Sequence, residues 1–342
     1  MTSRELVANT LSGKNTGRAP RQLWYLPWAE MYHPDGLMKI KKDFPNDIIN
    51  IGAGLSVHPK TEGDPHEIGT YVDAWGCVFT NSQRGVIGEV KRPIVTDDEW
   101  EDTGKVHIPE ELLTFSVKDA NENVKKYGGD KFTLGGCCPR PFEQLQFIRG
   151  SENLYMDVAL KPKGFLDFKD KMHDFYCRLL KKWAQTDVDG LSIMDDWGSQ
   201  KSLLINPKAW DELFKPMYKD YIDIAHKAGK KIFMHSDGYT LDIIPRLIDL
   251  GLDAFNTQIF CMGIGKLKQF KGKITFWGEI DWQGLLPNGT KRDIQEAVKN
   301  VYDNLYADGY CIAQCEFGAG AKPENVYTVF ETWDKLTERE AL

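Results

Sequence analysis

From about residue 131 onward, short apolar runs alternate regularly with longer amphipathic segments. Six of these runs are strand candidates, at residues 131–136, 190–194, 231–235, 254–259, 273–278 and 310–314, and residues 47–52 form an earlier one. The segments between them carry apolar residues three and four positions apart, which is typical of helices. This alternation predicts a parallel sheet with right-handed crossovers. At 342 residues, with no Gly-x-Gly-x-x-Gly fingerprint, a closed (β/α)8 TIM barrel is favoured over an open doubly wound sheet.

The first hundred residues do not follow this rhythm. In residues 1–45, aromatic residues crowd between prolines, and we expect an irregular wall or lid there. Residues 69–95 contain short alternating runs broken by turn formers, which predict an antiparallel hairpin inserted near the barrel. We therefore expect one barrel domain spanning 1–342 with these two additions.

Charge and cysteine content narrow the class of partner. The chain has 43 basic and 50 acidic residues and no basic stretch interleaved with aromatics, which argues against a nucleic-acid or anionic membrane surface and favours a small-molecule partner. Seven cysteines without regular spacing indicate reduced thiols and a cytoplasmic protein. The N-terminus lacks the apolar core of a signal peptide, and no run is long enough to span a membrane. The sequence leaves an oligomeric state open.

The strand at residues 231–235 ends in a pair of potential metal ligands, His235 and Asp237. Alternation places both side chains on one face if the strand stays extended. In a barrel, chemistry lies where strands finish, so this end is the predicted site. Together with Cys315 and one or two of Asp237, Glu279 or Gln258, His235 offers the imidazole, thiolate and oxygen donors that suit zinc.

Two further strand ends offer candidates for catalysis and substrate binding. Of the neighbours Asp195 and Asp196, only one can face the pocket, because adjacent residues of a strand point opposite ways. We expect Asp196 with Gln200 to be the pocket pair and Asp195 to cap the next helix. Arg140 either clamps a substrate carboxylate or pairs with Glu143.

Several of these motifs together resemble the uroporphyrinogen decarboxylase superfamily. The resemblance rests on Asp-Asp-Trp-Gly-Ser-Gln at 195–200, His-Ser-Asp-Gly at 235–238, Gly-Glu-Ile-Asp at 278–281 and Lys-Pro-Glu-Asn-Val at 322–326, with fits at 18–20 and 46–48. It implies a barrel, in agreement with the alternation of elements. Its members divide into porphyrin decarboxylases that need no cofactor and zinc methyltransferases that exchange methyl groups with a corrinoid protein.

The methyltransferase branch is the more similar of the two. Its thiol-specific members carry a His-x-Cys pair and a distant cysteine, which His235 and Cys315 match, whereas Asp237 replaces the middle cysteine. This harder donor set suits a zinc ion that acts as Lewis acid on an ether or hydroxyl oxygen, as in aryl-ether demethylases (O-demethylases). The resemblance thus implies a zinc site, a methyl donor such as a methoxylated ring and a corrinoid protein docked over the barrel mouth.

The decarboxylase branch is the alternative. Asp47 matches its pyrrole-binding aspartate, and Arg21 matches one of the arginines that hold its carboxylate-rich substrate. In the same stretch, however, Trp24 and Trp28 form an aromatic wall that suits a flat, less charged ligand. A third alternative is a non-catalytic tetrapyrrole or corrinoid carrier.

Overall fold

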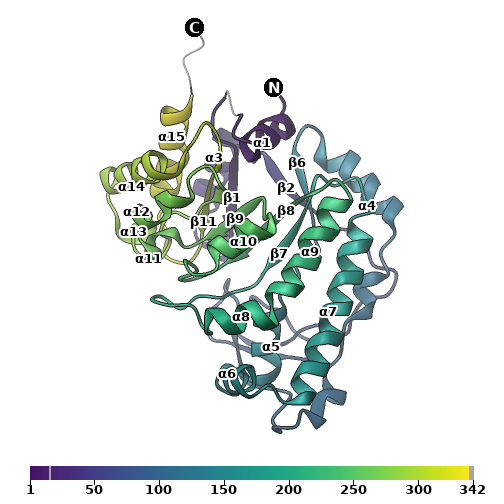
Figure 1. Ribbon diagram of the computed structural model, residues 1–342. Coiled ribbons are helices and arrows are strands. Elements are labelled where there is room, and N and C mark those ends of the chain that lie inside the picture. Colours follow the sequence, from purple (N-terminus) through teal and green to yellow (C-terminus); the bar gives the residue numbers. More distant parts are fainter. Residues whose placement is uncertain (15–16, 339–342) are drawn as a thin grey trace.

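Eight parallel strands form the centre of the computed structural model, which describes residues 1–14 and 17–338 (Figure 1). Residues 15–16 and 339–342 of the predicted domain lie outside the described residues. Neighbouring strands follow the order β1-β11-β10-β9-β8-β7-β6-β2, which is the strand order of a TIM-like barrel. Their bounds are β1 Arg21–Tyr25, β2 Ile48–Ile51, β6 Phe132–Gly135, β7 Gly190–Met194, β8 Lys231–Ser236, β9 Ala254–Thr257, β10 Thr275–Trp277 and β11 Cys311–Phe317.

The barrel closes where β1 meets β2, largely through residues that precede β2. The Asp47 backbone N–H donates to the Arg21 carbonyl at 2.8 Å. The Asn46 side-chain oxygen accepts from the Leu23 backbone N–H at 2.7 Å, and the Asp47 carboxylate accepts from the Arg21 N–H at 2.7 Å. Side chains therefore replace part of the missing strand ladder.

Helices surround the strands, and α1 (Ser3–Leu11) closes the N-terminal end of the barrel. Its Val7 and Leu11 pack into the interior core against Ile48, Phe132 and Leu134. Within the described ranges, no helix combines the length and apolarity needed to cross a bilayer. The remaining α-helices are α2 Pro27–Tyr32, α3 Pro34–Asp43, α4 Val117–Asn123, α5 Pro141–Arg149, α6 Ser151–Leu160, α7 Lys163–Trp183, α8 Pro207–Leu213, α9 Lys215–Lys227, α10 Ile244–Leu250, α11 Ile259–Met262, α12 Ile264–Leu267, α13 Leu285–Asn288, α14 Lys291–Leu305 and α15 Pro323–Thr337.

Local sequence signals explain several helix boundaries. The Asn206 side chain caps α8, accepting from the Lys208 N–H at 2.9 Å, with proline at the next position. Thr290 and Asp293 form a reciprocal capping box at the start of α14. The amphipathic segment between β7 and β8 divides at Phe214 into α8 and α9.

The inserted antiparallel element is a three-stranded sheet rather than a single hairpin. It comprises β3 (Gly69–Val72), β4 (Val78–Asn81) and β5 (Glu89–Arg92) in that order. Its position along the chain is as predicted, and the Tyr71 and Phe79 rings pack at 6.1 Å between centroids.

The predicted irregular wall at residues 1–45 is wrong in one important respect. Residues 21–25 form β1, a barrel strand fully paired in parallel with β11. The prolines that flank it disguised the strand, because Pro20 and Pro27 stand just outside the paired residues and remove no ladder hydrogen bond.

Candidate metal centre and substrate cavity

Alternation along the strands decides which side chains reach the barrel interior. The interior core contains Phe233 on β8, Ala254 on β9 and Ile312 on β11. Positions two residues further along each strand point the same way. His235 and Asn256 therefore share the interior at the C-terminal end of the barrel.

His235 lies between two carboxylates at this rim. Its Nε2 is 3.6 Å from Asp196 Oδ1 and 3.8 Å from Asp237 Oδ1. One ligand atom from each of the three residues lies within 4.8 Å of the other two. The structure thus brings together three residues that the sequence analysis proposed from two different strand ends.

A hydrogen-bond relay fixes the orientation of the His235 ring. Nδ1 lies 2.5 Å from the Asn256 side-chain oxygen, and the Asn256 amide donates to the Trp277 carbonyl. Because this amide orientation presents an acceptor to Nδ1, the Nδ1 proton is held there and Nε2 faces Asp196 and Asp237. Sequence reasoning missed Asn256, although an amide within an apolar strand was an available signal.

Two glycines bring the β7 and β8 loops close enough to form this cluster. A Cβ on Gly198 would lie 2.2 Å from the Tyr239 backbone nitrogen, and one on Gly238, whose φ is +77°, would lie 2.1 Å from the Gly198 carbonyl oxygen. The Gly198 N–H donates to the Asp237 carbonyl at 3.0 Å, and the Asp237 N–H donates to Asp196 Oδ1 at 2.8 Å. Only glycine permits this close backbone approach.

Negative charge exceeds positive charge around the imidazole. Burial alone would lower the pKa of His235, but Asp196, Asp237 and Glu279 together raise it to about 9. Burial and the nearby Asp237 raise the pKa of Glu279 to about 8, and burial also raises the pKa values of Asp237 and Glu316. Such a cluster of like charges is costly unless a cation compensates it.

The donor set fits a divalent metal ion. His235, Asp196 and Asp237 supply one nitrogen and two oxygen ligands, and the buried Glu279 Oε2 has no hydrogen-bond partner among the described residues. A buried, unpaired carboxylate oxygen requires an explanation, and a cation is a suitable one. Zinc accepts nitrogen and carboxylate ligands of this kind.

Cys315 does not belong to this donor set, which corrects the sequence prediction. Cys311, Ala313 and Cys315 pack in the outer core between the barrel and its helices, whereas Ile312 lies in the interior core. Alternation then turns Glu316, rather than Cys315, toward the interior, and its pKa responds to Asp237 and His235. The sequence prediction missed Glu316 because it chose Cys315 as the better type of zinc ligand and did not consider which face of the strand each residue occupies.

Asp195 and Asp196 divide their roles largely as predicted. Asp195 is fully buried and accepts from the backbone N–H groups of Phe142 and Glu143, at 3.0 and 2.7 Å, so it caps α5, which precedes it in the chain, rather than the next helix. Burial raises its pKa to about 8. Asp196 faces His235. Gln200, however, donates to Gln283 at 2.9 Å and does not pair with Asp196.

A cavity of about 790 Å³ lies between the three-stranded sheet and the β6 and β7 ends of the barrel, and it reaches Asp196. Arg140 and Glu143 lie in its wall, and the Arg140 NH1 is 3.3 Å from Glu143 Oε2. Burial raises the pKa of Glu143 to about 7, with Arg140 opposing that shift and Asp196 adding to it. The apolar lining includes Tyr71, Trp75, Phe79, Phe147, Phe175 and Tyr176.

A second cavity of about 380 Å³ adjoins Glu279 and is lined by Gln200 and Gln258. Gln258 accepts from the Gly238 N–H at 3.2 Å and hydrogen-bonds the Asp237 carboxylate. Gln258 thus helps to hold the Asp237 side chain in position. Gln200 lines this smaller cavity, whereas Asp196 lines the larger one.

The two predicted aromatic residues lie in different places. The Trp24 ring on β1 packs 5.3 Å from the His235 ring and 5.0 Å from Trp277, between centroids, and so forms part of the site wall. Trp28 on α2 packs against His33 at 5.2 Å, and its N–H donates to the Gly85 carbonyl. Trp28 is absent from the described linings of both cavities.

Asp47 and Arg21 lie at the opposite end of the barrel, so their predicted catalytic and substrate-binding roles are not supported. Asp47 immediately precedes β2, and its carboxylate accepts from Arg18 at 2.6 and 2.9 Å. Arg21 begins β1 and pairs with Asp334 on α15. Both are buried and partnered where strands start, not where they end.

Comparison with known proteins identifies the family to which this chain belongs. A methyltransferase from Methanosarcina mazei superposes with a TM-score of 0.70 at 14% identity, over 98% of this chain and 99% of that one. The 3-keto-D-glucoside 4-epimerase from E. coli gives a TM-score of 0.38 at 13% identity, over 64% of this chain and 84% of that one. Comparison with curated protein sequences gave no match. The uroporphyrinogen decarboxylase (URO-D) pattern matches residues 65–336, and the chain belongs to that family.

Proposed function

We propose that the protein is a zinc-dependent methyltransferase that takes a methyl group from a small methoxylated aromatic compound and delivers it to a corrinoid protein. The observation that carries this proposal is the cluster of Asp196, His235 and Asp237 at the barrel rim, beside the unpaired carboxylate oxygen of Glu279. The methyltransferase from Methanosarcina mazei, which shares the fold over almost its whole length, supports the reaction type.

The donor set favours an oxygen substrate over a sulfur substrate. His235, Asp196 and Asp237 would hold the ion, and Glu279 or Glu316 would complete its shell. A zinc ion with these ligands supplies Lewis acidity that polarises an ether oxygen. With Cys315 facing the outer helices, the group formed by Asp196, His235 and Asp237 contains no cysteine.

The chain's own residues position the donor and move the proton. The aromatic wall of the larger cavity suits a flat ring, and Arg140 suits a carboxylate carried by that ring. In the transfer, the methyl group leaves the ether oxygen, which keeps the bonding electrons, and the corrinoid supplies the pair for the new bond. The oxygen then needs a proton, which Glu143 supplies from its position in the cavity wall.

The decarboxylase alternative is less well supported by the charges at the site. A substrate bearing many carboxylates requires several free cations. The larger cavity instead presents Asp73, Glu89, Glu143 and Asp196 against Arg140. Asp47 and Arg21, which this alternative requires, lie at the other end of the barrel.

Metal analysis combined with a methyl-transfer assay tests the proposal. The purified protein should contain about one equivalent of zinc at the rim. With a methoxylated benzoate and a reduced corrinoid protein, it should release the free phenol and form methylated corrinoid. Metal-free protein with full activity would refute the proposal. Loss of carboxylates from uroporphyrinogen would favour the decarboxylase alternative, and stoichiometric corrinoid binding without turnover would favour a carrier.

A further inference from the structure

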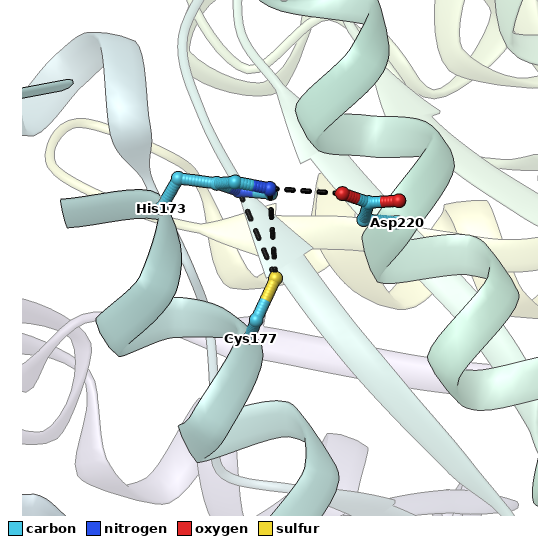
Figure 2. Close-up of side chains that lie close together, drawn as sticks. All are labelled: His173, Cys177 and Asp220. Carbon is cyan, nitrogen blue, oxygen red and sulfur yellow. Dashed lines mark hydrogen bonds and ion pairs between the residues drawn. The ribbon is translucent and has the colours of Figure 1, made fainter. Parts of the chain in front are cut away.

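A second group of metal-ligand types lies on the outside of the barrel, between helices α7 and α9, which run side by side (Figure 1). His173 and Cys177 are one helical turn apart on α7, and Asp220 faces them from α9 (Figure 2). His173 Nε2 lies 3.0 Å from Asp220 Oδ2, and Cys177 Sγ lies 3.7 Å from His173 Nε2. The group belongs to neither cavity described above.

We propose that His173, Cys177 and Asp220 form a second cation site, which binds a thiol-seeking divalent ion such as zinc. In tetrahedral zinc sites, bond lengths of about 2.3 Å to sulfur and 2.0 Å to nitrogen place those two ligands about 3.5 Å apart. Cys177 Sγ lies 3.7 Å from both Nε2 and Nδ1 of His173, so its distance to Nε2 is close to this value, and the sulfur would turn from the ring face toward Nε2 as an ion binds. Imidazole nitrogen, thiolate sulfur and carboxylate oxygen are each ligand types that zinc accepts.

The neighbouring hydroxyl supports the histidine tautomer that the site requires. His173 Nδ1 lies 3.2 Å from the Tyr221 hydroxyl oxygen, and Tyr221 is fully buried. An ion bound at Nε2 would displace the proton that Nε2 shares with Asp220, and Nδ1–H would then donate to the Tyr221 hydroxyl. Metal-binding histidines usually have such a hydrogen bond on the second ring nitrogen.

The surroundings of Cys177 argue against a nucleophilic Cys-His-Asp triad. Burial, and then the nearby Asp220, raise the pKa of Cys177 to about 12, so the free protein holds a neutral thiol. A nucleophile needs the opposite shift. A cation, by contrast, displaces the thiol proton as it binds.

Access from solvent is provided by the carboxylate side of the cluster. The Asp220 side chain is 57% exposed and that of His173 is 21% exposed, whereas Cys177 is buried. An ion can therefore enter past Asp220, and water can occupy the fourth coordination position. The bound ion would link α7 and α9, and it would stabilise the fold without taking part in the proposed reaction at the barrel rim.

Cobalt(II) substitution tests this site directly, because a cobalt–thiolate bond gives a near-ultraviolet charge-transfer band. The His235→Ala variant, stripped with a chelator, is titrated with Co²⁺ so that the rim site does not contribute. We expect the band to appear with about one equivalent and to disappear when Cys177→Ser is added. The matched control is His226 on α9, whose Nε2 lies 2.9 Å from a carboxylate oxygen of Asp253 in a pair that includes no cysteine. His226→Ala should leave the band intact.

Zinc should also raise the melting temperature of His235→Ala protein and leave that of the Cys177→Ser double variant unchanged. Absence of the band in folded His235→Ala protein would overturn the proposal, as would its persistence after Cys177→Ser. If Cys177→Ser fails to fold, the exposed Asp220→Asn variant replaces it and should weaken both signals. This test is independent of the proposed function. Cys177 lies outside the proposed reaction site, so the Cys177→Ser variant of the otherwise native chain should keep the methyl-transfer activity of the native protein, whichever methyl donor that protein uses.

Discussion

The two ends of the barrel both contain buried charged residues, but the balance of charge differs between them. At the N-terminal end, Asp47 pairs with Arg18 and Arg21 pairs with Asp334. At the C-terminal rim, the imidazole of His235 faces several carboxylates, and one oxygen of Glu279 has no hydrogen-bond partner in the part of the chain that the structure describes. Matched charges hold the barrel together, whereas unmatched charges create a place for a ligand. Each prediction below tests this distinction.

The largest expected effect is on stability, from Asp47→Ala. This change removes a buried carboxylate that accepts hydrogen bonds from Arg18, Ser3 and the Arg21 backbone N–H, and breaking such a buried pair costs about 3–5 kcal/mol of unfolding free energy. Urea unfolding followed by circular dichroism measures the loss. Burial alone would raise the pKa of Asp47, but Arg18 and other hydrogen bonds lower it, so its stabilisation is present above the unfolded pKa and disappears as acid titrates the folded carboxylate.

The comparison also predicts that folded Asp47→Ala protein keeps its turnover per molecule when assayed at low temperature. The Lys39→Ala variant, which breaks the exposed Lys39–Asp43 pair, is the control and should change stability by less than about 1 kcal/mol. If Asp47→Ala protein were stable but inactive, Asp47 would be a functional residue and the distinction between the ends would be wrong.

At the C-terminal rim, His235→Ala should impair metal binding and activity. We expect loss of the zinc ion at the rim, so that only the ion of the proposed His173, Cys177 and Asp220 site remains, and a decrease in kcat/KM of more than 100-fold, about 2.7 kcal/mol, because removal of a ligand exceeds the 10- to 100-fold cost of losing its hydrogen-bond partner. Atomic absorption and the methyl-transfer assay measure the two effects. Full zinc content in this variant would place the ion elsewhere.

Residue type alone identified most of the fold but only part of the site. The run at 231–235 and its counterparts predicted seven of the eight barrel strands because buried parallel strands are almost continuously apolar. The strand at 21–25 was missed because prolines and aromatics flank it. Asp196, His235 and Asp237 were identified because polar side chains that end apolar strands meet at one rim.

The errors came from geometry that residue types do not specify. Cys315 is the better zinc ligand by chemistry, yet a shift of one position along β11 turns it outward and Glu316 inward. Asp47 and Arg21 were assigned roles through the family resemblance, although Asp47 begins the predicted strand at 47–52 and so lies at the end of the barrel opposite the site. Asn256 was overlooked because its role depends on the adjacent strand, where it meets His235 across β8 and β9.

Asn256→Ala should have an intermediate effect at the rim. Without the amide oxygen, the His235 ring loses the hydrogen bond that fixes its tautomer, and such losses weaken metal affinity or activity by about 10- to 100-fold. Competition with a fluorescent zinc chelator measures the affinity, and excess zinc should restore part of the activity. The Asn46→Ala variant loses a comparable side-chain hydrogen bond at the opposite end and should leave zinc affinity unchanged.

The smallest expected effect is a pH dependence that links the cavity to the rim. Glu143 has a pKa raised to about 7 by burial, so it is about half protonated at that pH and loses its proton as pH rises. If Glu143 donates the proton to the departing oxygen, kcat/KM should fall by about tenfold for each pH unit well above this pKa. Glu143→Gln, which cannot donate a proton as an acid, should be slower and should lack this alkaline limb. An unchanged limb in Glu143→Gln protein would assign the titration to the rim cluster itself, and the unmatched charge there would then include the proton donor as well as the metal ligands.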